Sequence, residues 1–93
     1  METVQAEQLL LSLNNDWQLV GSGKVIAFDF KFKDYYQTID FVNALASIAN
    51  QQDHHPDLEV GYNHCLVKLS THSIGGLSDK DFTCAQLIEA LVN

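Results

Sequence analysis

The most regular pattern of apolar and polar residues lies between residues 24 and 33. Large apolar side chains alternate there with small or charged ones, as Ile26, Phe28, Phe30 and Phe32 against Ala27, Asp29, Lys31 and Lys33. A period of two residues predicts a β-strand with one face in the core. Such a half-buried strand is typical of an antiparallel sheet that packs against helices on one side only.

Three shorter segments also have strand character, at residues 17–20, 58–62 and 65–71. Gly21-Ser22-Gly23 is predicted to form the turn between the first two strands, because glycine readily adopts positive φ. Asn63-His64 is predicted to connect the last two strands, with His64 at the surface.

Helical spacing of apolar residues predicts three helices. Thr3 would cap the first, which runs to about Leu13, and Asp34 would cap the second. Pro56 ends the second helix, so that His54 falls in its last turn. Ser78 would cap the third helix with Asp81 at the capping-box position. The side chains expected on the buried side of this helix are Phe82, Ala85, Leu87, Ile88, Leu91 and Val92.

Helices and pairs of strands alternate along the chain in the order α-β-β-α-β-β-α. Hairpins separated by helices predict a two-layer α+β fold. The length of 93 residues suits a single domain, residues 1–93. A domain this small is only marginally stable as a monomer, so we expect an oligomer.

Composition excludes several classes of function. A net charge of −7 argues against direct nucleic-acid binding, which needs a basic surface. No apolar run has the length of a membrane span, and the first residues do not resemble a secretory signal, so we expect a cytoplasmic protein. Cys65 and Cys84 are expected to be buried and reduced.

The candidate chemistry lies between residues 53 and 81, where histidines fall at the ends of predicted elements. His54 and His55 follow the second helix, and His72 follows the last strand, just before Gly75-Gly76. Imidazoles that converge from different elements favour general acid–base catalysis near neutral pH. Taken singly, each histidine could equally be a surface residue. A zinc site made by His54, His72 and a carboxylate is a further alternative, although the helical His-x-x-x-His spacing is absent.

These residues resemble the pterin-4a-carbinolamine dehydratase family. The resemblance rests on the run His54-His55-Pro56 followed at fixed spacings by Tyr62, His72 and Asp81, and on Ser70-Thr71-His72 and Gly76-Leu77-Ser78. It implies a four-stranded antiparallel sheet with three helices on one face, and a homodimer or homotetramer. The implied reaction is dehydration of a 4a-hydroxytetrahydropterin to a quinonoid dihydropterin, which recycles tetrahydropterin without a metal or organic cofactor.

The resemblance also implies roles for individual residues. His54 and His72 would flank the pterin as acid and base, and His55 would orient it and share in proton transfer. Pro56 and Thr71 would line the site. Asp81 has two interpretations, as a helix cap or as a supporting residue of the site.

Two positions depart from the family pattern. Asn50 stands where many members have an acidic residue, four positions before the first histidine, and Leu58 replaces a frequent tryptophan. Positions four apart share a helix face, so a carboxylate at position 50 would orient His54 and hold its proton better than an amide does. The asparagine at position 50 therefore leaves an alternative function open, namely a non-catalytic dimerisation or adaptor module on the same fold.

Overall fold

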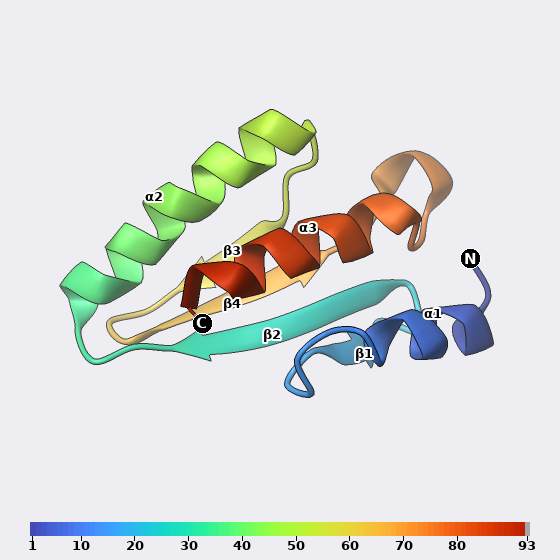
Figure 1. The fold of residues 1–93 in the computed structure, drawn as a ribbon, viewed down its shortest axis with the longest axis horizontal. Helices are drawn as coiled ribbons and strands as arrows, with labels where there is room; N and C mark the ends of the chain where they lie inside the picture. Colours follow the sequence, from blue (N-terminus) through green and yellow to red (C-terminus); the bar gives the residue numbers. More distant parts are fainter. Residues whose placement is uncertain (93) are drawn as a thin grey trace.

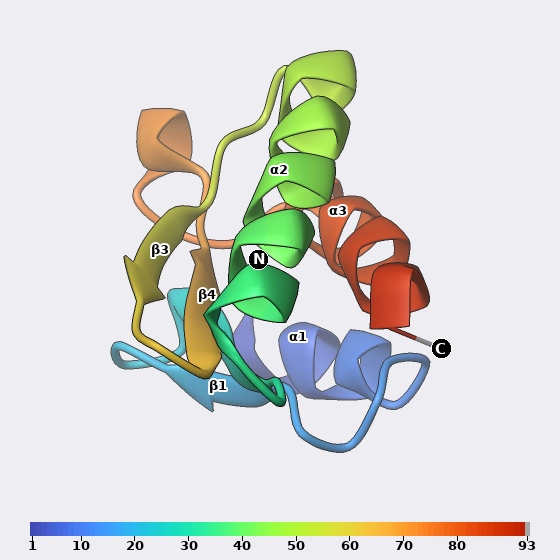
Figure 2. The same ribbon diagram turned by 90° about the vertical axis from the view of Figure 1, so that its left-hand side faces the viewer.

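The four strands form one antiparallel sheet whose order is β1-β2-β4-β3, and the helices cover one of its faces (Figures 1 and 2). This arrangement comes from a computed structural model that describes residues 1–92. The elements are α1 (Thr3–Leu10), β1 (Gln18–Val20), β2 (Val25–Lys31), α2 (Tyr35–Gln52), β3 (Asp57–Val60), β4 (His64–Leu69), α3 (Asp79–Glu89) and the 3-10 turns η1 (His72–Ile74) and η2 (Ala90–Val92). The predicted α+β fold is confirmed.

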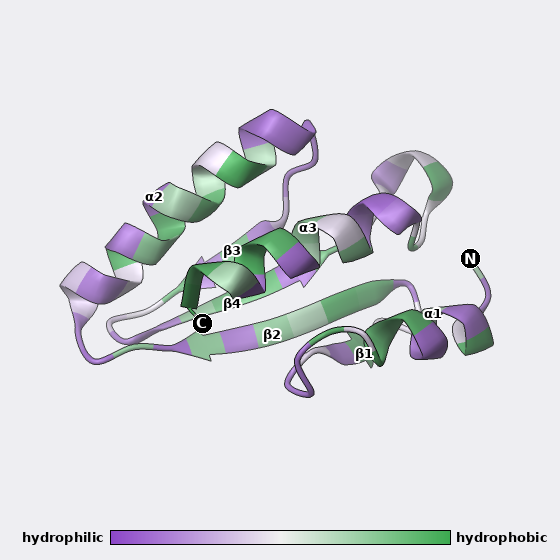
Figure 3. Ribbon diagram, viewed as in Figure 1, coloured by the Kyte–Doolittle hydropathy of each residue, from purple (hydrophilic) through white to green (hydrophobic). Residues whose placement is uncertain are grey.

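The core lies between β2, β4 and the helices. Phe30 pairs with Cys65 in the β2–β4 register, and Ile26 pairs with Leu69, so these buried side chains point to the same face. The alternation predicted for β2 is confirmed for Ile26 and Phe30, but Ala27 on the opposite face is also buried and Phe28 is only half-buried. Figure 3 shows apolar residues recurring along β2 and along the helices, with polar residues between them.

The predicted caps are confirmed for two of the three helices. Gln37 N–H donates to Asp34 Oδ1 over 2.9 Å at the start of α2, and Ser78 and Asp81 form the capping box of α3. The prediction for the first helix was wrong, because Glu2 is the N-cap residue and Thr3 already lies within α1. Helix α1 also ends at Leu10, before Leu13.

Fewer residues of the last helix are buried than the sequence predicted. Phe82, Ala85 and Ile88 are buried, but Leu87 and Leu91 are each 40% exposed. Val92 is also exposed. The buried residues are spaced three apart, which keeps them on one side of α3, whereas Leu87 projects elsewhere and the chain changes to a 3-10 turn at Ala90.

His64 was wrongly expected in a connecting turn, since it is the first residue of β4. Its Nδ1 lies 2.9 Å from Asp29 Oδ1 on β2, and Lys31 donates to the other oxygen of the same carboxylate. Partial burial acts to raise the pKa of Asp29, but hydrogen bonds and charge from Lys31 and His64 outweigh it and lower that pKa. His64 thus belongs to a polar cluster on the sheet.

Cys65 and Cys84 are free and buried, as expected. Burial, with a smaller contribution from the charge of Asp29, raises the pKa of Cys65 to about 11. Burial and the charge of Asp81 likewise raise the pKa of Cys84. Both effects disfavour the reactive thiolate.

We therefore expect the folded protein to resist a thiol reagent at pH 8. Ellman's reagent should label far less than one thiol per chain within the time in which free cysteine reacts completely, and two thiols per chain in denaturant. Rapid labelling of the folded protein would contradict the burial of these cysteines.

Candidate active site

A pocket of about 290 Å³ lies where the end of α2, the end of β4, η1 and the start of α3 meet. In Figure 1 these segments gather at one end of the molecule. The pocket is lined by Asp53, His54, His55, Ser70, Thr71, His72, Ser73 and Lys80. The structure therefore brings together the three histidines and the threonine proposed from sequence. Pro56 does not line this pocket.

The chain turns sharply at Asp53, directly before the two adjacent histidines. Helix α2 ends at Gln52, and Asp53 adopts the left-handed conformation with φ 50° and ψ 44°. His54 N–H then donates to Ala49 O over 3.1 Å. The prediction that His54 lies in the last helical turn was therefore wrong. A left-handed residue is a common helix terminator, and here it directs His54 away from the helix.

His54 is held by a buried carboxylate. Its Nε2 lies 2.5 Å from Asp81 Oδ1, and the two side chains are 11% and 0% exposed. Because an ionised carboxylate only accepts hydrogen bonds, Nε2 is the nitrogen that carries the proton. Nδ1 is left as the nitrogen at which His54 can exchange a proton with a ligand.

Asp81 joins the histidine to the helix cap. Its Oδ2 accepts from Ser78 N–H over 3.0 Å and from the Thr71 hydroxyl over 2.8 Å, while Oδ1 faces His54. The Thr71 and Ser78 hydroxyls lie 2.7 Å apart. The two interpretations of Asp81 are therefore compatible, since one carboxylate caps α3 and contacts His54.

The side chain of Asn50 contacts His55 rather than His54. Asn50 Oδ1 lies 3.1 Å from His55 Nε2. The expectation that position 50 supports His54 was therefore wrong, and the physical reason is the left-handed turn at Asp53. This turn takes His54 toward Asp81 and leaves the next residue beside the last turn of α2.

Four lining residues were missed from sequence: Asp53, Ser70, Ser73 and Lys80. Each is adjacent in sequence to a residue of the proposed site or its helix cap, and this proximity was the signal available. Lys80 is the only lysine or arginine among the lining residues, and Asp53 is the only acidic one, so the pocket wall carries one basic and one acidic side chain besides its histidines.

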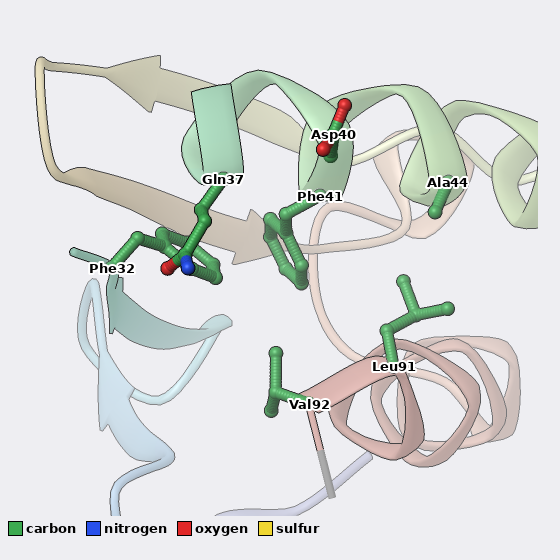
Figure 4. Close-up of a pocket in the computed structure, with 7 residues that line it drawn as sticks. All are labelled: Phe32, Gln37, Asp40, Phe41, Ala44, Leu91 and Val92. Atoms are coloured by element: carbon green, nitrogen blue, oxygen red, sulfur yellow. The ribbon is translucent and has the colours of Figure 1, made fainter. Parts of the chain in front are cut away.

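A second cavity, of about 280 Å³, lies between α2 and the C-terminal turn (Figure 4). Its walls are mainly apolar, with Phe32, Phe41 and Leu91 facing the same space. Asp40 is its only ionisable lining residue, and no histidine reaches it. The pocket at the end of α2 is therefore the better candidate for acid–base chemistry.

Two further features, a metal-binding cluster and a membrane-spanning helix, are absent from residues 1–92. No group of three or more histidine, cysteine or acidic side chains in this range is arranged to hold a metal ion. No helix in this range is both long enough and apolar enough to cross a membrane.

By its fold and its pocket, this chain is a small α+β domain with histidines at one end of the helical layer. A sequence model of the pterin 4 alpha carbinolamine dehydratase family matches residues 1–91. The chain belongs to this family, whose named activity is that of a hydro-lyase. The resemblance drawn from the spacing of residues 54 to 81 is thereby confirmed.

Relatives agree with this assignment. A Nitrosomonas eutropha protein named "Putative pterin-4-alpha-carbinolamine dehydratase" is 51% identical over 88 residues, which cover 95% of this chain and 76% of that protein. A Bdellovibrio bacteriovorus protein of the same name is 52% identical over 93 residues, covering 96% of this chain and 76% of the relative.

Solved structures confirm the fold. A transcriptional coactivator/pterin dehydratase from Brucella melitensis superposes with a TM-score of 0.94 at 31% identity, over 100% of this chain and 98% of the other. A pterin dehydratase-like protein described as a RuBisCO assembly factor in the α-carboxysome superposes with a TM-score of 0.72 at 23% identity, over 84% and 90%. The second likeness concerns the fold alone.

Proposed function

We propose that this protein dehydrates a 4a-hydroxytetrahydropterin to a quinonoid dihydropterin and water by histidine acid–base catalysis. The observation that supports this most strongly is the meeting of His54, His55 and His72 at one pocket. Imidazoles are suited to giving and taking protons near neutral pH. The family to which the chain belongs supplies the class of substrate.

The reaction needs two proton transfers and no oxidant or reductant. One group donates a proton to the 4a-hydroxyl, so that the bond from C4a to oxygen breaks and water leaves. Another group accepts the proton of N5, and the electron pair of that bond forms the double bond between N5 and C4a. The proposed mechanism therefore needs an acid and a base on the pocket wall.

His54 and His72 are proposed to act as this acid and base. The contact with Asp81 supports the role of His54, because a nearby carboxylate stabilises the charged imidazole during transfer. His55 is proposed to orient the pterin and share in proton transfer. Thr71, which lines the pocket and also contacts Asp81, is proposed to complete the substrate site.

We further propose that the activity recycles tetrahydropterin in the cytoplasm and that the protein forms dimers or tetramers. Two free, buried thiols are in keeping with a reducing compartment. The small size of the domain, 93 residues, limits how much surface a monomer can bury and is in keeping with an oligomer.

The decisive experiment follows the decay of freshly generated 4a-hydroxytetrahydropterin with wild type, with His72→Ala and in buffer alone. We expect wild type to accelerate the decay and His72→Ala to lose most of the acceleration, by roughly 10²–10⁴-fold. Circular dichroism would establish that both proteins are folded. A folded wild type without any acceleration would overturn the proposal and favour the adaptor module.

A further inference from the structure

The two adjacent histidines have different hydrogen-bond partners. Nε2 of His54 faces the carboxylate of Asp81, whereas Nε2 of His55 faces the side-chain oxygen of Asn50 at 3.1 Å. In both rings Nδ1 makes no hydrogen bond to another residue within the described range 1–92. The partners differ in charge, one being an anion and the other a neutral amide.

An amide oxygen can only accept a hydrogen bond. When His55 is neutral, the contact between its Nε2 and Asn50 Oδ1 therefore requires the tautomer in which Nε2 carries the hydrogen. Nδ1 then holds the lone pair and is the nitrogen able to accept a proton. The partner of a histidine ring commonly fixes its tautomer and orientation in this way.

We propose that Asn50 is a positioning residue that holds His55 in its Nε2–H tautomer, so that Nδ1 of His55 is presented as a proton acceptor. This inference rests on the proposed function for its catalytic consequence, but the tautomer itself does not depend on activity. Asn50 acts through His55 and is not among the residues that line the pocket.

Charge distinguishes this arrangement from the one at His54. The carboxylate of Asp81 stabilises a positive charge on His54, which suits a ring that carries a proton to be donated. The neutral amide beside His55 provides no such full charge. Asp53 and Lys80, which carry opposite charges, also line the pocket near these rings. Asn50 thereby helps to give the two neighbouring imidazoles different tasks.

The test exchanges the hydrogen-bonding capacity of position 50. The asparagine amide can accept through Oδ1 or donate through Nδ2, whereas in Asn50→Asp the ionised side chain only accepts and in Asn50→Lys it only donates. Asn43→Lys is the matched control, because Asn43 is an exposed asparagine on the same helix and lies outside the pocket. The readouts are the ¹⁵N shifts of both His55 ring nitrogens, recorded where the ring is neutral, and kcat/KM for dehydration.

We expect Nε2 to give a protonated-type ¹⁵N shift in wild type, Asn50→Asp and Asn43→Lys, and to lose it in Asn50→Lys. The rate should fall about tenfold or more only in Asn50→Lys, since a misplaced catalytic group is costly. An unchanged His55 tautomer in Asn50→Lys would overturn the inference, as would a changed tautomer with an unchanged rate. An inactive wild type would instead count against the proposed function, while the ¹⁵N shifts would still decide whether Asn50 holds the tautomer.

Discussion

Replacing Asp81 with alanine should lower the free energy of unfolding by roughly 3–5 kcal/mol, because each buried donor left without an acceptor costs about 1–3 kcal/mol. The carboxylate is fully buried and accepts from His54, Thr71 and the backbone of Ser78. Its removal leaves these donors without their acceptor and also removes the capping box of α3. Because a domain is stable by only about 5–15 kcal/mol, the variant would be close to unfolding.

Urea denaturation followed by circular dichroism measures this effect. Asp79→Ala is the matched control, since Asp79 is an exposed acidic residue in the same first turn of α3. The control should lose no more than about 1 kcal/mol, the contribution of a charge at a helix terminus. Asp81→Asn keeps an acceptor oxygen and should lie between the two. Equal losses for Asp79→Ala and Asp81→Ala would contradict the importance of the buried network.

Local signals made much of the fold predictable. The alternation of large apolar side chains with small or charged ones from Ile26 to Lys33 depends only on neighbouring residues, and so does the capping-box spacing of Ser78 and Asp81. The extent of burial on α3 was less predictable. Leu87 and Leu91 have helical spacing and apolar side chains, but their exposure depends on how α3 lies on the sheet and on its change to a 3-10 turn.

The candidate site was likewise predictable in part. The histidine spacing was sufficient to bring His54, His55 and His72 into one hypothesis, because each follows a recognisable element. The partners of the rings were harder to predict, since they depend on one left-handed residue, Asp53. A helix extended by two residues would have placed Asn50 beside His54, as positions four apart share a face.

Replacing His54 with glutamine should abolish most of the proposed activity while preserving the fold. The glutamine amide can donate to Asp81 as Nε2 of His54 does, so the buried carboxylate keeps a partner. Glutamine has no group that titrates near neutral pH and therefore cannot act as acid or base. We expect kcat/KM to fall by roughly 10²–10⁴-fold, the usual contribution of a positioned acid–base group.

The matched control is His64→Gln, because His64 is also a histidine paired with an aspartate but lies on the sheet outside the pocket. It should retain the wild-type rate, which would separate a loss at the pocket from a general effect of removing an imidazole. The decay of 4a-hydroxytetrahydropterin provides the rate, and the urea midpoint shows whether each variant remains folded. If His54→Gln stayed active and folded, His54 would not be the acid or base, and the proton transfers would have to be assigned to His55 and His72. The contact between His54 and Asp81 would then be a structural link between the end of α2 and the cap of α3.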